Sequence, residues 1–125
     1  MPLPPTTTAA ALDAEALARL RELDPGGRSG LLQRVVNAYL ASLERLVPDL
    51  DRARGTQAEA ETLRHVAHTL KSSSASVGAL QVSQRCAEIE ALARERQLER
   101  IEPLLVQLLE ELAQARLALT QLLGA

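Results

Sequence analysis

Apolar residues recur every three to four positions along most of this chain. The longest run has them at positions 32, 35, 36, 39, 40, 43, 46, 47 and 50, a spacing that places them on one face of an α-helix. The 125 residues include 25 Leu and 21 Ala, and Tyr39 is the only aromatic residue, so side chains that favour strands are scarce. We therefore expect an all-α protein, and the length suits one domain with its own core.

Capping residues and helix breakers divide this pattern into five predicted helices. We expect them at about 14–23, 30–54, 79–96 and 99–123, with one more running from a capping box at Thr56 to about 77. Asp13 is the predicted N-cap of the first helix and Ser29 that of the second. Both have short polar side chains that can accept hydrogen bonds from free N–H groups at a helix start.

Glycine and proline fix the expected helix ends and irregularities. Gly55 and Gly78 are predicted to follow the second and third helices as left-handed residues. Pro48 should kink the second helix or split it near Val47, since proline lacks the N–H that a helix interior uses. Pro103 is expected in the first turn of the last helix, where proline is tolerated.

Several amphipathic helices joined by short connections favour an antiparallel four-helix bundle. The short first helix is expected to cap one end of that bundle. Residues 1–10, rich in Pro and Thr, are expected to be a flexible lead-in or linker, and residues 11–125 the bundle domain.

Charge and composition exclude several classes of function. The formal net charge of −2 and the scarcity of aromatic side chains argue against binding to nucleic acid. A single cysteine, Cys86, cannot form an internal disulfide, which favours a reducing, cytoplasmic setting. The N-terminus has no signal-peptide pattern, and no apolar run is long enough to span a membrane.

The predicted third helix carries both histidines and Lys71, the one lysine among 14 basic residues. On a helical wheel its core face holds Leu63, Val66, Ala67, Leu70, Ser74 and Val77. His68 falls on the opposite, exposed side, with Arg64, Lys71, Ser72 and Ala75 around it. The small side chains there leave the imidazole open to close approach by a partner protein.

This segment resembles the signature of histidine-containing phosphotransfer (HPt) domains. The stretch His68-Thr-Leu-Lys71-Ser72-Ser-Ser, with Gly78 ten residues after the histidine, is similar to H-x-L-K-G-S-S, with Ser72 where glycine is usual. The resemblance covers about 12–123. It includes a kinked second helix and a Cys-Ala-Glu-Ile-Glu stretch that ends at Glu90.

The resemblance implies a phosphorelay intermediate. His68 would accept a phosphoryl group from the aspartyl phosphate of a receiver domain and pass it to another receiver. The implied partners are receiver domains of response regulators and a sensor or hybrid histidine kinase. The chain would be a phosphocarrier rather than an enzyme and would need no cofactor, because the receiver supplies the magnesium.

The resemblance also implies roles for individual side chains. Lys71 would hold the transferred oxygens as a compact charge. Glu90, on the next helix, would orient the imidazole and favour the charged phosphoimidazolium. The expected docking surface comprises Arg64, Ser72, Ala75, Gly78 and Arg94.

Other interpretations stay open at this stage. The chain could be a helical adaptor that binds a signalling partner without using His68 chemically. A dimerising kinase helix is disfavoured, because Thr69 stands where such helices have an acidic residue. A metal site from His65, His68, Glu61 and Cys86 is not expected, because Cys86 lies on an apolar stripe and fits a core position. The cognate partners, the oligomeric state, and whether the domain stands alone or ends a hybrid kinase are not predicted.

Overall fold

The computed structural model describes residues 11–54 and 60–124, and the regular secondary structure in these ranges is helical. The α-helices are α1 (Ala14–Glu22), α2 (Leu31–Arg52), α3 (Ala60–Ser76), α4 (Leu80–Arg94) and α5 (Leu98–Gly124), with a short 3₁₀ turn, η2, at Pro25–Gly27. No helix in the described ranges is long and apolar enough to cross a membrane.

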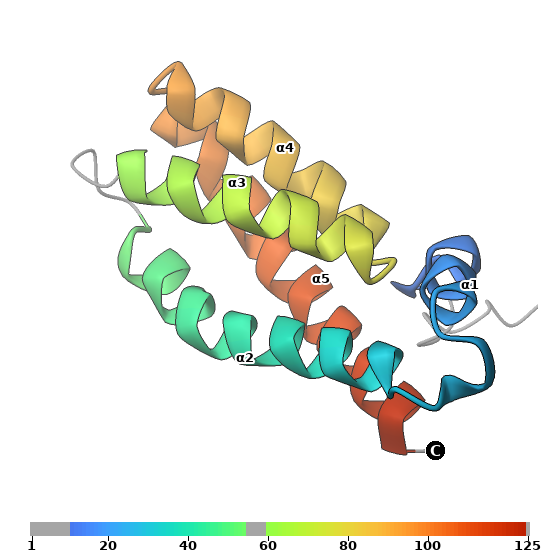
Figure 1. Ribbon diagram of the computed structural model, residues 1–125. Coiled ribbons are helices and arrows are strands. Elements are labelled where there is room, and N and C mark those ends of the chain that lie inside the picture. Colours follow the sequence, from blue (N-terminus) through green and yellow to red (C-terminus); the bar gives the residue numbers. More distant parts are fainter. Residues whose placement is uncertain (1–10, 55–59, 125) are drawn as a thin grey trace, which may run out of the picture.

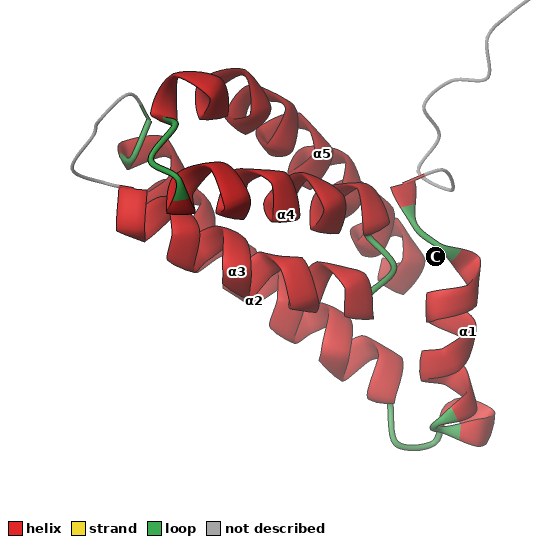
Figure 2. Ribbon diagram, turned by 90° about the horizontal axis from the view of Figure 1, so that it is seen from above, coloured by secondary structure: helices red, strands yellow, loops and turns green. Residues whose placement is uncertain are grey.

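Helices α2 to α5 form an antiparallel bundle, and α1 lies across one end of it, beside the C-terminal end of α3 (Figures 1 and 2). The closest packing is between α3 and α4. The predicted fold class, a four-helix bundle with a short capping helix, is confirmed. The arrangement buries one apolar stripe of each helix against the others, as the helical periodicity requires.

The core is formed mainly by leucines from α2 to α5. Its largest fully buried members include Leu43, Leu50, Leu63, Leu70, Ile89, Ile101, Leu105, Leu108 and Leu119. Tyr39 is also buried, and its hydroxyl lies 2.7 Å from Oγ of the buried Ser74, which joins α2 to α3. Burial raises the pKa of Tyr39 to about 12, because the phenolate would lose its hydration.

The start of α1 agrees with the prediction, but the start of α2 does not. Asp13 caps α1, with its carboxylate accepting the N–H of Ala16 at 3.1 Å. The predicted cap Ser29 is wrong, since Gly30 occupies the N-cap position of α2. Asp24 instead reaches across the turn and accepts the N–H groups of Ser29 and Leu31, both at 3.1 Å. These two backbone bonds lower the pKa of Asp24.

Both internal prolines lie inside helices. The helix α2 continues through Pro48 to Arg52, so of the two predicted outcomes, a kink or a split near Val47, the split does not occur. Leu46 and Leu50 on either side of Pro48 are buried, and their packing offsets the lost backbone hydrogen bond. Because α5 begins at Leu98, Pro103 lies beyond its first turn.

Gly78 ends α3 as predicted and also seats α1. Its φ of +84° is left-handed, and the N–H of Ala79 returns to the carbonyl of Ser74 at 2.8 Å. The N–H of Asp13 donates to the Gly78 carbonyl at 2.7 Å. A Cβ at this position would lie 2.9 Å from the Asp13 carbonyl oxygen, so only glycine fits without displacing α1. The predicted Gly55 end, the Thr56 capping box and the lead-in 1–10 lie outside the described residues.

Candidate functional site

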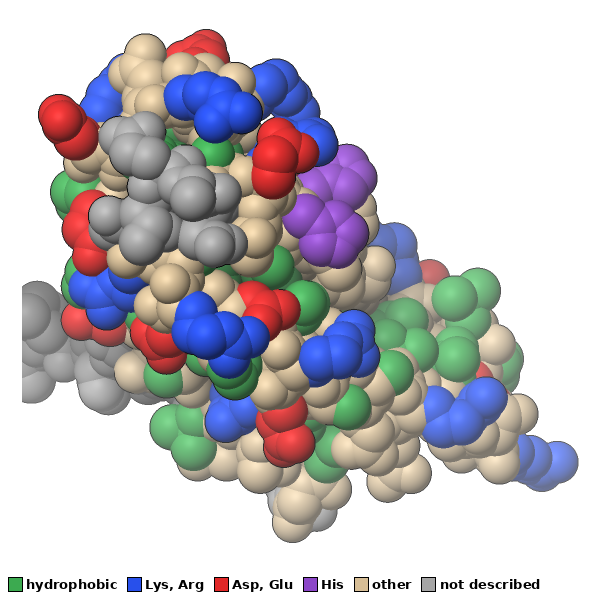
Figure 3. Space-filling view, turned by 90° about the vertical axis from the view of Figure 1, so that its left-hand side faces the viewer, with side chains coloured by type: hydrophobic (Ala, Val, Ile, Leu, Met, Phe, Trp, Pro, Cys, Tyr) green, Lys and Arg blue, Asp and Glu red, His purple; other side chains and the backbone are tan. Residues whose placement is uncertain are grey.

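The helix α3 presents His68 on the outer face of the bundle. Its neighbours Ala67 and Leu70 are fully buried, which fixes the rotation of the helix about its axis. The side chain of His68 therefore points outward and is 65% exposed. Figure 3 shows the two histidines side by side at the surface, with Lys and Arg side chains near them.

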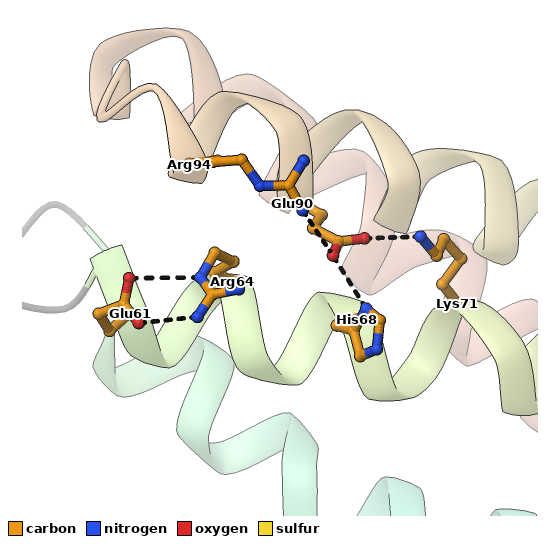
Figure 4. Close-up of polar contacts among 6 residues, drawn as sticks. All are labelled: Glu61, Arg64, His68, Lys71, Glu90 and Arg94. Atoms are coloured by element: carbon orange, nitrogen blue, oxygen red, sulfur yellow. Dashed lines mark hydrogen bonds and ion pairs between the residues drawn. The ribbon is translucent and has the colours of Figure 1, made fainter.

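The imidazole contacts a buried carboxylate on the adjacent helix. Nδ1 of His68 lies 2.9 Å from Oε2 of Glu90 in α4, and the Glu90 side chain is only 6% exposed (Figure 4). The pKa of Glu90 is lowered, chiefly by the hydrogen bond from Lys71 and further by that from His68, against the opposing effect of burial. Glu90 is therefore ionised at neutral pH despite its burial.

This contact defines the tautomer of the ring. An ionised carboxylate can only accept hydrogen bonds, so Nδ1 of His68 must carry the proton that it shares with Glu90. In the neutral ring the lone pair then belongs to Nε2. The nucleophilic nitrogen is thus the one that Glu90 does not contact, on an exposed side chain.

Two cations share the carboxylate with His68. Nζ of Lys71 donates to Oε1 of Glu90 at 2.7 Å, and Nη2 of Arg94 donates to Oε2 at 3.2 Å. Their side chains are 37% and 63% exposed, respectively. Glu90 is therefore the centre of the cluster, and both cations remain accessible to a ligand at the surface.

The remaining candidate residues lie in different surroundings. Arg64 forms an ion pair with Glu61 at 2.9 Å and is drawn toward that residue in Figure 4. Ser72 is exposed and Ala75 is half-buried on the turns that follow His68. Gly78 is buried against α1, so it offers no surface to a partner, in contrast to its predicted place in the docking surface. The structural role of Gly78 is to end α3 and to allow the close approach of α1.

Serine hydroxyls around the site are engaged by backbone carbonyls. Ser73 Oγ donates to the Thr69 carbonyl at 3.2 Å, and Ser76 Oγ donates to that of Ser72 at 3.1 Å. Ser83 in α4 donates to the Lys71 carbonyl at 2.8 Å, a contact between helices that the sequence pattern did not indicate. These short side chains fold back on their own helix, so they do not project beyond the His68 ring.

Neither His65 nor Cys86 forms a metal centre with the residues around His68. His65 is exposed, and no group of three or more potential metal ligands occurs in the described part of the chain. Cys86 is fully buried in the core, as predicted, and burial raises the pKa of its thiol to about 12. A thiol in that state is a poor metal ligand and a poor nucleophile.

A separate apolar groove lies between α2 and α5. Its volume is about 360 Å³, and its lining comprises Leu43, Val47, Leu109, Leu112, Ala113, Arg116, Leu117 and Thr120. None of these residues belongs to the cluster around His68. The histidine thus lies on an exposed helix face, apart from this groove.

Comparison with known proteins agrees with this arrangement. The family model for the Hpt domain matches residues 34–118, and the chain belongs to that family. The crystal structure of histidine-containing phosphotransfer protein B (HptB) from Pseudomonas aeruginosa PAO1 is similar, with 32% identity, a TM-score of 0.69, and coverage of 90% of this chain and 94% of that chain. No curated protein matches the chain significantly.

Membership in this family defines the general role of the chain. Hpt domains are phosphotransfer intermediates of two-component signalling, and they carry phosphoryl groups rather than catalyse reactions as classical enzymes. They interact with receiver domains and histidine kinases.

Proposed function

We propose that His68 is the phosphoacceptor, and that it takes a phosphoryl group from one receiver domain and passes it to another. The observation that carries the proposal is the pairing of Nδ1 with the buried Glu90, which leaves the lone pair of Nε2 on an exposed ring. A neutral imidazole is a competent nucleophile near neutral pH.

The phosphoryl transfer requires no proton transfer. The Nε2 lone pair attacks the phosphorus of the aspartyl phosphate in line, the Nε2–P bond forms, and the P–O bond to the aspartyl carboxyl breaks to release a carboxylate. The ring keeps its Nδ1 proton and becomes a phosphoimidazolium, whose positive charge the Glu90 carboxylate stabilises. In the onward step the Nε2–P bond breaks and the electron pair returns to Nε2, which regenerates the neutral ring.

The two cations beside Glu90 offer charge to the transferred group. Lys71 has three N–H donors, and its bond to Glu90 uses one of them. Its other two N–H groups can point toward phosphoryl oxygens, which a compact ammonium group stabilises well. The exposed residues Ser72 and Arg94, with the half-buried Arg64 and Ala75, would line the docking surface around this point.

The proposal assigns the remaining chemistry to the partners. The receiver would hold the magnesium ion and supply the acidic site, so that this chain works without a cofactor of its own. A sensor or hybrid histidine kinase would be the first source of the phosphoryl group. Such a relay would operate in the cytoplasm, the compartment expected from the sequence.

A transfer assay tests this function. The chain would be incubated with receiver domains phosphorylated on aspartate, and the label on the chain would be examined for acid lability and base stability, in wild type and in His68→Gln. We expect such a label on wild type and none on the variant. No label on wild type from several receivers would favour the adaptor alternative, and label retained by His68→Gln would move the site to another residue, with His65 as the next candidate.

A further inference from the structure

Helix α4 contacts Lys71 at both its backbone and its ammonium group. Oγ of Ser83 donates to the Lys71 carbonyl at 2.8 Å, and Nζ of Lys71 donates to Oε1 of Glu90 at 2.7 Å. Ser83 and Glu90 are about two turns apart on α4, so both lie on the side of that helix that faces α3. Two separate contacts from α4 therefore meet on one residue of α3.

The hydroxyl of Ser83 bonds to a different helix from its own. Serine hydroxyls inside helices commonly donate back to a carbonyl of the preceding turn, as those of Ser73 and Ser76 do in α3. The N–H group of Ser83 bonds within the chain in the ordinary way, to the Ala79 carbonyl at 3.1 Å. Its hydroxyl instead crosses to α3 in a partly buried contact. This bond therefore connects the two helices rather than stabilising α4 alone.

The direction of the Lys71 side chain links the Ser83 contact to the site. Helices α3 and α4 are antiparallel and are connected by residues 77–79, so the start of α4 packs against the end of α3 (Figure 2). A helical side chain leans toward the N-terminus of its helix, and Lys71 accordingly extends toward Glu90 and His68 (Figure 4). The position of the Lys71 backbone relative to α4 thus determines where its ammonium group lies.

We propose that Ser83 is a positioning residue for phosphoryl transfer. By holding the Lys71 carbonyl, it fixes α3 against α4 so that the Lys71 ammonium group lies at Glu90, beside the His68 ring. The inference rests on the proposed function, in which Lys71 offers charge to the transferred group. Ser83 is assigned no contact with the phosphoryl group and acts only through Lys71.

The physical reason is the flexibility of lysine. Its ammonium group sits on a long stem with many rotamers, so a charge placed in advance stabilises a transition state better than one that must first be ordered. Two contacts, one at the backbone and one at the ammonium group, restrict that freedom. Without the Ser83 hydroxyl, α3 keeps its own backbone bonds, but the turn that carries Lys71 can shift relative to Glu90.

The test measures how fast the chain accepts a phosphoryl group from phosphoramidate, a small donor that requires no partner protein. The proteins compared are wild type, Ser83→Ala, Ser83→Thr, Lys71→Ala and the double variant Ser83→Ala with Lys71→Ala. Ser76→Ala is the matched control, because it removes a hydroxyl that also donates to a backbone carbonyl, at 3.1 Å, but within α3. Circular dichroism and urea unfolding verify that each variant is folded.

We expect Ser83→Ala to react about threefold more slowly than wild type, a smaller loss than removal of the Lys71 charge itself causes. Ser83→Thr should react at nearly the wild-type rate, because it keeps the hydroxyl, and Ser76→Ala should equal wild type. In the Lys71→Ala background, Ser83→Ala should cause no further loss, since the residue through which it acts is gone.

The double variant separates positioning from a merely structural role. If Ser83 only helped to hold the bundle together, Ser83→Ala would slow the reaction by the same factor with and without Lys71. That result would overturn the proposal. A wild-type rate for Ser83→Ala would overturn it as well.

An NMR relaxation measurement separates this inference from the proposed function. Lys71 is the only lysine in the chain, so lysine-selective ¹³C labelling gives a single ε-methylene signal. Its order parameter should fall in Ser83→Ala, as in Glu90→Gln, and stay at the wild-type value in Ser76→Ala. An unchanged order parameter in Ser83→Ala would overturn the role of Ser83 even if His68 is phosphorylated. If no phosphoryl label forms on wild type, the proposed function fails, and the relaxation measurement decides whether Ser83 positions Lys71.

Discussion

The exposed imidazole of His68 is oriented by a carboxylate that is itself buried, since Nδ1 lies 2.9 Å from Oε2 of Glu90 on the neighbouring helix. A buried acid is held more rigidly than a surface one, because packing restricts its rotamers. The ring thus gains a fixed tautomer while remaining open to a partner.

Removal of the Glu90 side chain should impair phosphotransfer without unfolding the bundle. In Glu90→Ala the ring loses its orienting partner, and Lys71 and Arg94 lose the charge that holds them, so acceptance from phosphoramidate should slow by about tenfold. Circular dichroism would verify that the helices persist. An unchanged rate would remove Glu90 from the functional site.

Lys71 tests whether the site requires a compact charge. Lys71→Ala should slow transfer by about tenfold, because the phosphoryl oxygens lose a nearby cation. Lys71→Arg should give an intermediate rate, since it keeps the charge but replaces a point ammonium with a planar fork. The measurement is the rate of label transfer from a phosphorylated receiver, and a rate for Lys71→Ala equal to that of wild type would argue against the assigned role.

The lowered pKa of Glu90 makes part of the stability depend on pH. Because the folded pKa lies below the ordinary value of 4.5, ionised Glu90 stabilises the fold above that pH, and the contribution is lost as the pH falls through the folded pKa. Urea unfolding should show Glu90→Gln less stable than wild type by about 1 kcal/mol at pH 7. The difference should be smaller at pH 3, because the contribution is lost progressively as the pH falls below 4.5.

Glu88→Gln is the control for this pH dependence. Glu88 is on the same helix, is exposed, and pairs with Arg85 at the surface, where an ion pair contributes little. Its substitution should leave stability nearly unchanged at both pH values. A Glu90→Gln deficit that persists undiminished at pH 3 would indicate a packing effect rather than a charge effect.

Two glycines with similar positive φ values separate backbone strain from crowding where α1 packs on the end of α3. Gly78 and Gly26 have φ values of +84° and +80°, but a Cβ would meet the Asp13 backbone only at Gly78. Gly26→Ala should cost about 1 kcal/mol for the left-handed conformation alone, and Gly78→Ala at least about 2 kcal/mol. Thermal or urea unfolding provides the comparison. Equal losses of unfolding free energy in the two variants would mean that α1 can shift away from a Cβ at position 78 without a loss of stability.

Local patterns were sufficient to predict the fold, because the apolar stripe of each helix follows from the spacing of apolar residues within that helix. The helix ends were less predictable where distant groups act. Asp24 accepts backbone N–H groups at the start of α2 from several residues upstream, whereas residue type at the adjacent position favours Ser29 as the cap. The continuity of α2 through Pro48 depends on the burial of Leu46 and Leu50, which is a tertiary effect.

The candidate site shows the same division between local and distant contributions. The exposure of His68 follows from the helical wheel of one segment, and the structure confirms it. Glu90 was proposed from the family resemblance, and its contact with His68 depends on the register between α3 and α4. That Arg94 shares an oxygen with the histidine could not be predicted, because no local pattern encodes which side chains converge on one buried atom. The roles of these residues remain predictions.

The central claim is that Nε2 of His68 carries the phosphoryl group. The most direct measurement is phosphorus–proton correlation NMR on the chain phosphorylated by phosphoramidate, with His68→Gln and His65→Gln as companions. We predict one phosphohistidine signal that couples as the Nε2 isomer, survives in His65→Gln and is absent from His68→Gln. A signal from the Nδ1 isomer, or one that persists in His68→Gln, would contradict the claim.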